Sequence, residues 1–261
     1  MKKLLILTAL LLSIIACKDE PDGPNTKAPV NERSYIQGFF ELNDLYIGSI
    51  SGFKVDKAAH SIIHNTSFDP PKLYEIKDGV GIVTSTGNEI MGNGYISYES
   101  ILYKSLIEKI GDLSYNSKIT DGFAYDGRVV ALVDTLQNIT ITCDKAFSEK
   151  YPAGSSLNEL FSIYFEEPYT TIKNGYKSST GDNYYTINIF NNKFPYSLFG
   201  ANLATIDLSK KYYIGTKWYF ILEKAPENSG EYLLTVSVTN TEGKTLEKTA
   251  NDPIQLRGLN D

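Results

Sequence analysis

The feature that most constrains the fold of this chain is a series of short alternating segments after residue 136. Tyr232, Leu234, Val236 and Val238 alternate with polar neighbours, so one face of this segment is expected to be buried and the other wet. Similar segments recur at 138–143, 161–165, 184–190, 203–208, 217–223, 231–239 and 244–250, with a further candidate at 253–257. Short strands separated by turns are typical of a sandwich. We therefore predict a mainly β fold, with an immunoglobulin-like β-sandwich over residues 136–261.

The residues before this region predict a second β-rich part with one helix. Residues 35–135 contain two candidate strands within 35–55 and a candidate hairpin over 73–83, turning at Asp78-Gly79. Residues 56–64 predict a short helix. Residues 99–110 predict an amphipathic helix, because their apolar side chains fall on one stripe and Gly111 ends the pattern. We expect this helix to pack on a sheet.

The first residues have the pattern of a secretory targeting signal. Three residues, Met1-Lys2-Lys3, give a positive start, and residues 4–15 form an apolar run of about 12, too short for the roughly 20 that a membrane-spanning helix needs. Ala16-Cys17 resembles a bacterial lipobox, in which the cysteine thiol is lipidated and the chain is cleaved before it. We predict that residues 1–16 are a lipoprotein signal peptide and that Cys17 carries the lipid. The alternative is a simple secreted protein.

The residues after the cysteine predict where the anchored protein lies. Lys18, Asp19 and Glu20 resemble the export signal of Bacteroidetes lipoproteins, which implies an outer-membrane protein that faces the cell exterior. Residues 17–34 are rich in Pro and Gly and predict a flexible tether. Removal of residues 1–16 leaves 23 basic and 31 acidic residues, a net charge of −8. This charge argues against a nucleic-acid partner and leaves the lipid as the contact with the membrane.

A resemblance covers the leader and roughly the second half of the chain. Residues 139–147, then 151–161 with Tyr151-Pro152-Ala153-Gly154, and the ending with Trp218 and Pro226 are similar to stretches of uncharacterised surface-exposed lipoproteins of Bacteroides and its relatives. The resemblance implies an outer-membrane lipoprotein. That family has no known activity, so the resemblance brings no functional residues to this chain.

Aromatic residues are the main candidates for ligand binding. The chain contains 19 Tyr and 12 Phe residues. Six aromatic residues of the second half could form a platform on which sugars stack: Tyr184, Tyr185, Tyr212, Tyr213, Trp218 and Tyr219. The alternative is that they fill the core. Trp218 shares a strand face with Phe220 and Leu222, which favours the core for Trp218 and leaves Tyr219 as the fallback.

Other residues offer weaker signals for chemistry. His60 and His64 are four apart and would share one face of a helix, where they could bind Zn²⁺ or Ni²⁺ or simply face solvent. Glu166-Glu167 is the only paired carboxylate of the second half, as a glycosidase would need, but no partner is indicated. Asp134-Thr135-Leu136 matches a short acceptor pattern for O-glycosylation at Thr135. Cys143 shares a face with Ile139 and Ile141 and is expected to be a buried core thiol.

These observations favour a binding or adhesion module for a glycan or a protein at the cell surface. The alternatives are a structural component of a surface assembly and an uncharacterised hydrolase. No nucleophile–base pair, metal-ligand set or phosphate-binding motif occurs at motif spacing, so we predict no enzyme activity and no cofactor.

Overall fold

The computed structural model describes residues 34–64, 73–85, 95–115, 129–177, 179–189 and 192–261. The predicted signal peptide, the lipidation site Cys17, the export signal and most of the tether lie outside the described residues. The fold is mainly β, as predicted. Within the described part, the α-helices are α3 (Ile101–Ile110) and α4 (Pro168–Lys173), and several strands form four sheets.

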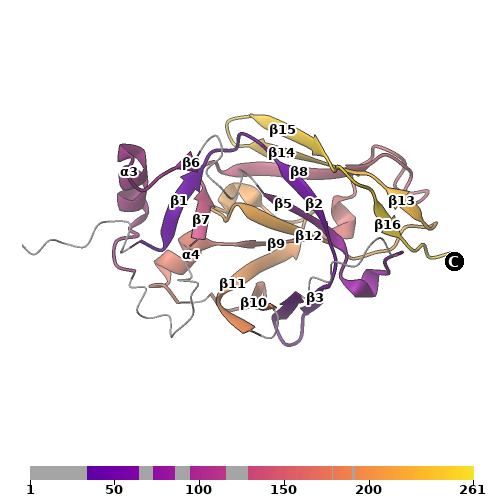
Figure 1. Cartoon of the computed structure of the whole chain (residues 1–261), viewed down its shortest axis with the longest axis horizontal. Coiled ribbons are helices and arrows are strands. Elements are labelled where there is room, and N and C mark those ends of the chain that lie inside the picture. The colour runs from indigo at the N-terminus through magenta and orange to yellow at the C-terminus, as the bar shows by residue number, and fades with distance from the viewer. Residues whose placement is uncertain (1–33, 65–72, 86–94, 116–128, 178, 190–191) are drawn as a thin grey trace, which may run out of the picture.

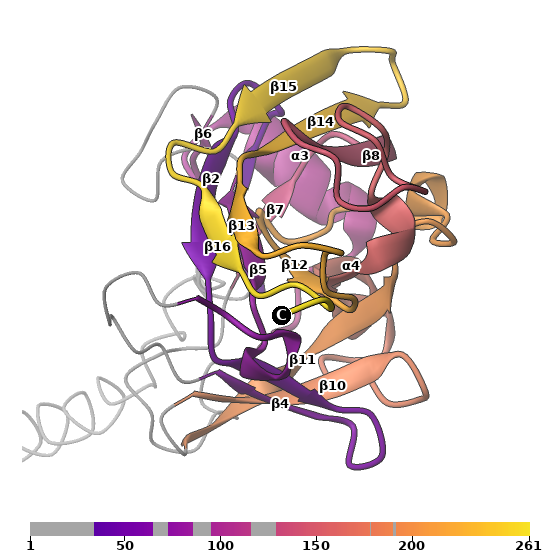
Figure 2. The same cartoon turned by 90° about the vertical axis from the view of Figure 1, so that its right-hand side faces the viewer.

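The largest sheet has eight strands and is rolled (Figures 1 and 2). Its order is β2 (Tyr46–Ile50), β5 (Gly81–Ser85), β12 (Lys217–Leu222), β9 (Phe161–Glu166), β11 (Asn192–Asn202), β10 (Tyr184–Ile189), β4 (Ser61–His64) and β3 (Phe53–Asp56). Its two edge strands, β2 and β3, are consecutive in the chain and are joined only by Ser51 and Gly52. The ring of Phe53 in β3 lies 5.0 Å from that of Tyr219 in β12, so the two ends of the sheet curl toward each other.

Aromatic rings fill the inside of this rolled sheet. Phe53 contacts Tyr164 as well as Tyr219, and Tyr164 contacts Tyr185. Gly200 in β11 faces Tyr164 across the ladder, and a Cβ on Gly200 would lie 2.4 Å from the Tyr164 ring. Only glycine therefore leaves room for this ring, and the interior is closely packed rather than hollow.

A three-stranded sheet covers the outside of the rolled sheet. Its order is β15 (Thr245–Thr249), β14 (Leu234–Asn240) and β8 (Leu136–Cys143). The alternating residues Val236 and Val238 of β14 and Ile141 of β8 are fully buried against residues of β9 and β12 such as Phe165 and Phe220. A short ribbon, β13 (Gly230–Tyr232) with β16 (Ile254–Leu256), closes one end of this core (Figure 1).

A third sheet and α3 form a separate cluster at the other end of the molecule (Figure 1). The sheet contains β6 (Tyr95–Ile96), β1 (Ile36–Phe40) and β7 (Val129–Leu132), with β1 and β7 parallel. The Ser100 hydroxyl accepts a hydrogen bond from the Tyr103 N–H at the start of α3, and Gly111 ends the helix with φ of 78°. The predicted amphipathic helix is thus confirmed, and it packs on a sheet as expected.

Asp112, directly after α3, holds the beginning of β1. Its two carboxylate oxygens accept hydrogen bonds of 2.8 Å from the N–H groups of Tyr35 and Ile36. The side chain of Asp112 is fully buried, and burial raises its pKa, against the effect of these two hydrogen bonds. The first described strand is therefore fixed to the end of α3 at the residues that follow the predicted tether.

Several local predictions are wrong, for identifiable reasons. Residues 56–64 form no helix: the Asp56 side chain accepts from the N–H groups of Ala58 and Ala59, which makes a tight turn between β3 and β4. Asp78-Gly79 makes no hairpin, because it ends the 3₁₀ turn η1 (Ile76–Asp78), and Tyr74 instead pairs with the C-terminal strand at Gln255.

Two predictions in the second half are also wrong. Residues 203–208 are a turn that leads into the 3₁₀ turn η4 (Leu208–Lys210), while the long strand β11 lies earlier in the chain. The pattern Ser156-Leu157-Asn158-Glu159 predicts a capping box at the start of a helical turn. A turn of 3₁₀ helix, η3 (Asn158–Leu160), does form there, but without a side-chain cap hydrogen bond. The Asn158 side chain instead bonds the edge of β8, accepting from the Ile141 N–H and donating to the Ile139 carbonyl.

Candidate functional site

Two segments that are distant in the sequence meet at one end of the rolled sheet. One is the start of α4, preceded by Glu167, and the other is the loop from Lys211 to Gly215 before β12. The Glu167 carboxylate lies 2.8 Å from the Lys211 ammonium, and the two side chains are only 6% and 21% exposed. Glu167 also accepts a hydrogen bond of 2.6 Å from the Tyr184 hydroxyl. A buried charge that is paired and hydrogen-bonded in this way fixes the two segments relative to each other.

The two segments bring three tyrosines together, here called the tyrosine patch: Tyr169 of α4 with Tyr212 and Tyr213 of the loop. The Tyr169 ring lies 6.0 Å from the Tyr212 ring and 5.9 Å from the Tyr213 ring, measured between centroids. Tyr212 is 48% exposed, while Tyr169 and Tyr213 are half-buried. No described residue hydrogen-bonds to any of the three hydroxyl groups. The patch therefore presents both aromatic surface and phenol groups to solvent.

Hydrogen bonds to β9 and β12 fix the backbone of the loop at Gly215. The Gly215 N–H donates to the Glu166 carbonyl at 2.9 Å, and the Trp218 indole N–H donates to the Gly215 carbonyl at 2.8 Å. Tyr213 has φ of 50°, a region that tyrosine rarely adopts, and its ring contacts the buried Phe39. This contact buries one side of Tyr213 and turns its neighbour Tyr212 outward.

Two ionisable residues that hydrogen-bond to these segments have shifted pKa values. Burial raises the pKa of Glu166 from its ordinary value of 4.5 to about 7, although the nearby Lys217 ammonium acts in the opposite direction. Burial, together with the hydrogen bond to Glu167, raises the pKa of Tyr184 to about 12. The Tyr184 hydroxyl thus stays protonated and remains a donor to Glu167 at neutral pH.

The structure divides the six aromatic residues that the sequence suggested as one platform. Trp218 is fully buried and half-buried Tyr184 packs against the same main core, while Tyr185 and Tyr219 lie in the cluster inside the rolled sheet. Trp218 and Tyr219 are therefore not exposed stacking surfaces. Only Tyr212 and Tyr213 belong to the patch. Sequence reasoning missed Tyr169, whose one local signal is its place after Glu167-Pro168, where proline begins a helix.

His60 and His64 do not share a helix face, because His60 ends the turn that follows β3 and His64 ends the strand β4. The His64 Nε2 atom is buried and has no hydrogen-bond partner in the described structure, and burial, with the Lys217 charge, lowers the pKa of His64. The His64 ring packs against Phe53. In the described ranges no group of three His, Cys, Asp or Glu residues is arranged to hold a metal ion.

The structure also describes the surroundings of Cys143 and Thr135, two further candidates from the sequence. The predicted burial of Cys143 is confirmed: the side chain is 4% exposed and burial raises the pKa of its thiol to about 11. Thr135 is half-buried between β7 and β8, and the neighbouring Asp134 carboxylate accepts from the Leu42 N–H and the Asn240 side-chain amide, both at 2.6 Å. Asp134 thus has a structural role beside the predicted O-glycosylation site, which stays a prediction.

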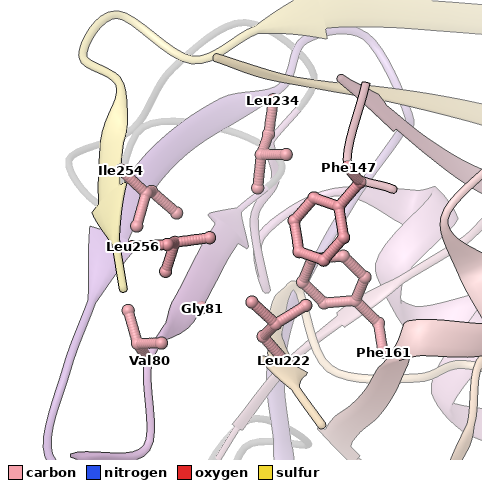
Figure 3. A pocket seen from close by; sticks show the side chains of 8 residues that line it. All are labelled: Val80, Gly81, Phe147, Phe161, Leu222, Leu234, Ile254 and Leu256. Atoms are coloured by element: carbon pink, nitrogen blue, oxygen red, sulfur yellow. The ribbon is translucent and has the colours of Figure 1, made fainter. Parts of the chain in front are cut away.

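A crevice in the main core offers no ligand site (Figure 3). It contains about 210 Å³ of space between atoms but nowhere admits a water-sized molecule. It is lined only by apolar side chains and one glycine: Val80, Gly81, Phe147, Phe161, Leu222, Leu234, Ile254 and Leu256. With no polar group to orient a ligand, this space is a packing gap between β13, β16 and the rolled sheet.

Comparison of the chain with protein-family models, with curated proteins and with solved structures finds no match. Within the described ranges, neither helix has the length and apolar character required to traverse a bilayer.

Proposed function

We propose that this protein is a surface binding module that takes a carbohydrate ligand on the tyrosine patch. The observation that carries the proposal is the exposed Tyr212 ring, held beside Tyr169 by a buried ion pair, with three hydroxyl groups that have no protein partner in the described structure. Aromatic faces stack on the apolar faces of sugars, and phenol groups donate and accept hydrogen bonds with sugar hydroxyls.

The architecture favours binding over a role in packing alone. Tyrosine loses little conformational entropy when it contacts a ligand, and the Glu167–Lys211 pair already fixes the two segments that carry the rings. Elsewhere in the described chain, tyrosine hydroxyls such as those of Tyr103 and Tyr232 donate to backbone carbonyls. The patch lacks such bonds, so its polar groups are available to a partner.

Binding of the mature protein to a carbohydrate array tests this proposal. Replacement of Tyr212 with Ala should abolish binding to any polysaccharide that the native protein retains, because it removes the most exposed ring of the patch. Replacement of Tyr98 with Ala is the matched control, since Tyr98 is 45% exposed but lies before α3 and outside the patch. Retention of a protein ligand instead of a polysaccharide, lost in the same Tyr212 variant, would keep the binding site but change the class of its ligand.

The proposed location is the outer membrane, to which a lipid on Cys17 anchors the protein. The signal Lys18-Asp19-Glu20 directs the protein to the outer face of this membrane, so that the folded part faces the cell exterior. The support comes from the sequence and from the position of β1, which begins at Ile36, two residues after the predicted tether of residues 17–34. If the export signal acts as proposed, replacement of Lys18, Asp19 and Glu20 with Ala should reduce access of external protease to the protein on intact cells.

A role as a component of a surface assembly is the second candidate, and β15 is the feature that favours it. The bonds Asn240 N–H to Lys244 O and Ala250 N–H to Leu234 O fix the alternation of the β14–β15 ladder, so the backbone groups of Thr245, Glu247 and Thr249 point away from β14. No described strand pairs with them. However, the antiparallel registers that overlap most of this edge in two copies place Glu247 opposite Glu247 or one lysine opposite another. Such repulsion disfavours self-assembly through this edge.

The immunoglobulin-like form of residues 136–261 belongs to the same proposal. Its support is the packing of β8, β14 and β15 over β9 and β12. Pairing of β12 with β5, from the first half of the chain, and the parallel β4–β10 pair extend the second layer beyond such a sandwich. The absence of enzyme activity is likewise proposed, and its support is that Glu167 is neutralised by Lys211. The uncharacterised hydrolase is retained as the weakest alternative.

A further inference from the structure

A lysine beside the tyrosine patch differs from other lysines that lie over aromatic rings. The Lys173 ammonium lies 5.1 Å from the centre of the Tyr169 ring and donates a hydrogen bond of 3.1 Å to the Ile110 carbonyl. The Lys173 side chain is exposed, and no described carboxylate forms an ion pair with it. The charge of Lys173 is thus oriented by a ring and a carbonyl but is not neutralised.

The other lysines with such a position carry a carboxylate partner. Lys150 lies 4.9 Å over Tyr151 but forms an ion pair of 2.6 Å with Glu159, and Lys211 lies 3.5 Å over Phe199 but is paired with Glu167. Lys210, which is close enough to Tyr212 to interact electrostatically with it, is paired with Asp207 at 2.8 Å. Unlike these three lysines, Lys173 has no carboxylate partner among the described residues, so its positive charge is not neutralised. The net charge of the whole chain is −6.

We propose that the ligand of the tyrosine patch is a carboxylated sugar, such as a uronic acid unit of a polysaccharide, whose carboxylate binds Lys173. This inference rests on the proposed carbohydrate-binding function and names the class of its ligand. One sugar ring stacks on Tyr212, and the carboxylate of a neighbouring sugar unit forms a charge-assisted hydrogen bond with the Lys173 ammonium. The Lys173 ammonium lies 5.1 Å from the centre of the Tyr169 ring, and the centres of the Tyr169 and Tyr212 rings are 6.0 Å apart. Two linked sugar units can therefore reach from Tyr212 to Lys173.

The position of Lys173 suits recognition rather than stability. An exposed ion pair contributes little to folding, but an ammonium already held by a carbonyl loses less freedom when a ligand carboxylate arrives. An acidic protein repels a polyanion in general, so binding of such a ligand requires a local cation. Selectivity for the carboxylate should then depend on this single lysine and weaken as the salt concentration rises.

Calorimetric titration of the full mature protein with two forms of one ligand tests the proposal. The probes are an oligogalacturonate and the same oligosaccharide after methyl esterification, which removes the charges and keeps the rings. We expect the native protein to bind the charged form roughly 10-fold more tightly, as one charge-assisted hydrogen bond would give. Lys173→Met should reduce this preference to about one, and Lys150→Met, which also removes a lysine over a tyrosine, should leave it unchanged.

The outcomes separate this inference from the proposed function. If the native protein binds the charged and esterified forms with equal affinity, and Tyr212→Ala binds neither, the proposed recognition of a carboxylate is wrong. The carbohydrate site itself would be retained. Binding of neither form, nor of any polysaccharide on the array, would overturn both. The comparison of the two ligands uses the native protein, so it decides the question even if Lys173→Met is destabilised by loss of the bond to Ile110.

Discussion

The Glu167 carboxylate and the Lys211 ammonium lie 2.8 Å apart at the junction of α4 and the loop before β12, with 6% and 21% of their side chains exposed. This ion pair joins the two segments that form the tyrosine patch. Within the described residues, it is the ion pair that links the segments carrying Tyr169 and Tyr212, so its removal should affect both folding and binding.

Replacement of Lys211 with Met should destabilise the protein by about 3 kcal/mol, because the buried Glu167 carboxylate then loses its ionic partner. Urea denaturation would measure this change. The double variant Glu167→Gln with Lys211→Met should recover part of the loss, because neither buried charge remains. A Lys211→Met variant as stable as the native protein would show that the pair does not hold this junction.

The carboxyl group of Glu166 should make stability depend on pH. Its pKa is raised in the folded protein from 4.5 to about 7, so the folded state binds a proton more tightly than the unfolded state. The resulting stability is fully present below about pH 4.5 and is lost as the pH rises through about 7, by at most about 3 kcal/mol. In denaturation series across this range, Glu166→Gln should lack this component. Parallel pH curves for the two proteins would contradict it.

The Cys143 thiol should be inert in the folded protein. It lies in the core beside the β8–β14 ladder, and burial raises its pKa to about 11, so almost no thiolate exists at neutral pH. A thiol reagent should label Cys143 only after denaturant is added. Rapid labelling in buffer at pH 7.5, with Cys17 blocked or absent, would show that β8 opens or has another register.

Lipidation at Cys17 should decide where the protein lies. Replacement of Cys17 with Ala removes the only thiol at the proposed cleavage site, so the protein should leave the detergent phase on phase partitioning and accumulate as precursor or soluble material. Replacement of Cys143 with Ala is the control for the loss of a thiol. Partitioning that is unchanged by Cys17→Ala would remove the lipid anchor from the account.

Much of the β structure could be predicted because it depends on local pattern. Residues 231–239 alternate between apolar and polar side chains, and β14 buries one face as that pattern requires. Helix α3 was predictable because its apolar stripe is followed by Gly111. By contrast, Ile62 and Ile63 form a short apolar run that fits a helix or a strand, and only the pairing of β4 with β3 and β10 decides between them.

The candidate site could be predicted only in part. The adjacent residues Tyr212 and Tyr213 attract attention as aromatics, but the sequence does not show that Tyr213 packs against Phe39 while Tyr212 faces solvent. The contact of Tyr169 with this pair and the Glu167–Lys211 ion pair join segments about forty residues apart. Such contacts depend on how β9, β11 and β12 are ordered in the sheet, which local periodicity does not determine.

Hydroxyl-radical footprinting tests the central claim, that the tyrosine patch is the ligand-binding surface, most directly. The oxidation rates of Tyr169, Tyr212 and Tyr213 would be measured by mass spectrometry with and without a saturating oligogalacturonate. We predict that oxidation of Tyr212 falls at least several-fold in the presence of the ligand, whereas that of Tyr98, which is equally exposed but outside the patch, does not change. Unchanged oxidation of Tyr212, or protection confined to another surface such as β15, would contradict the claim.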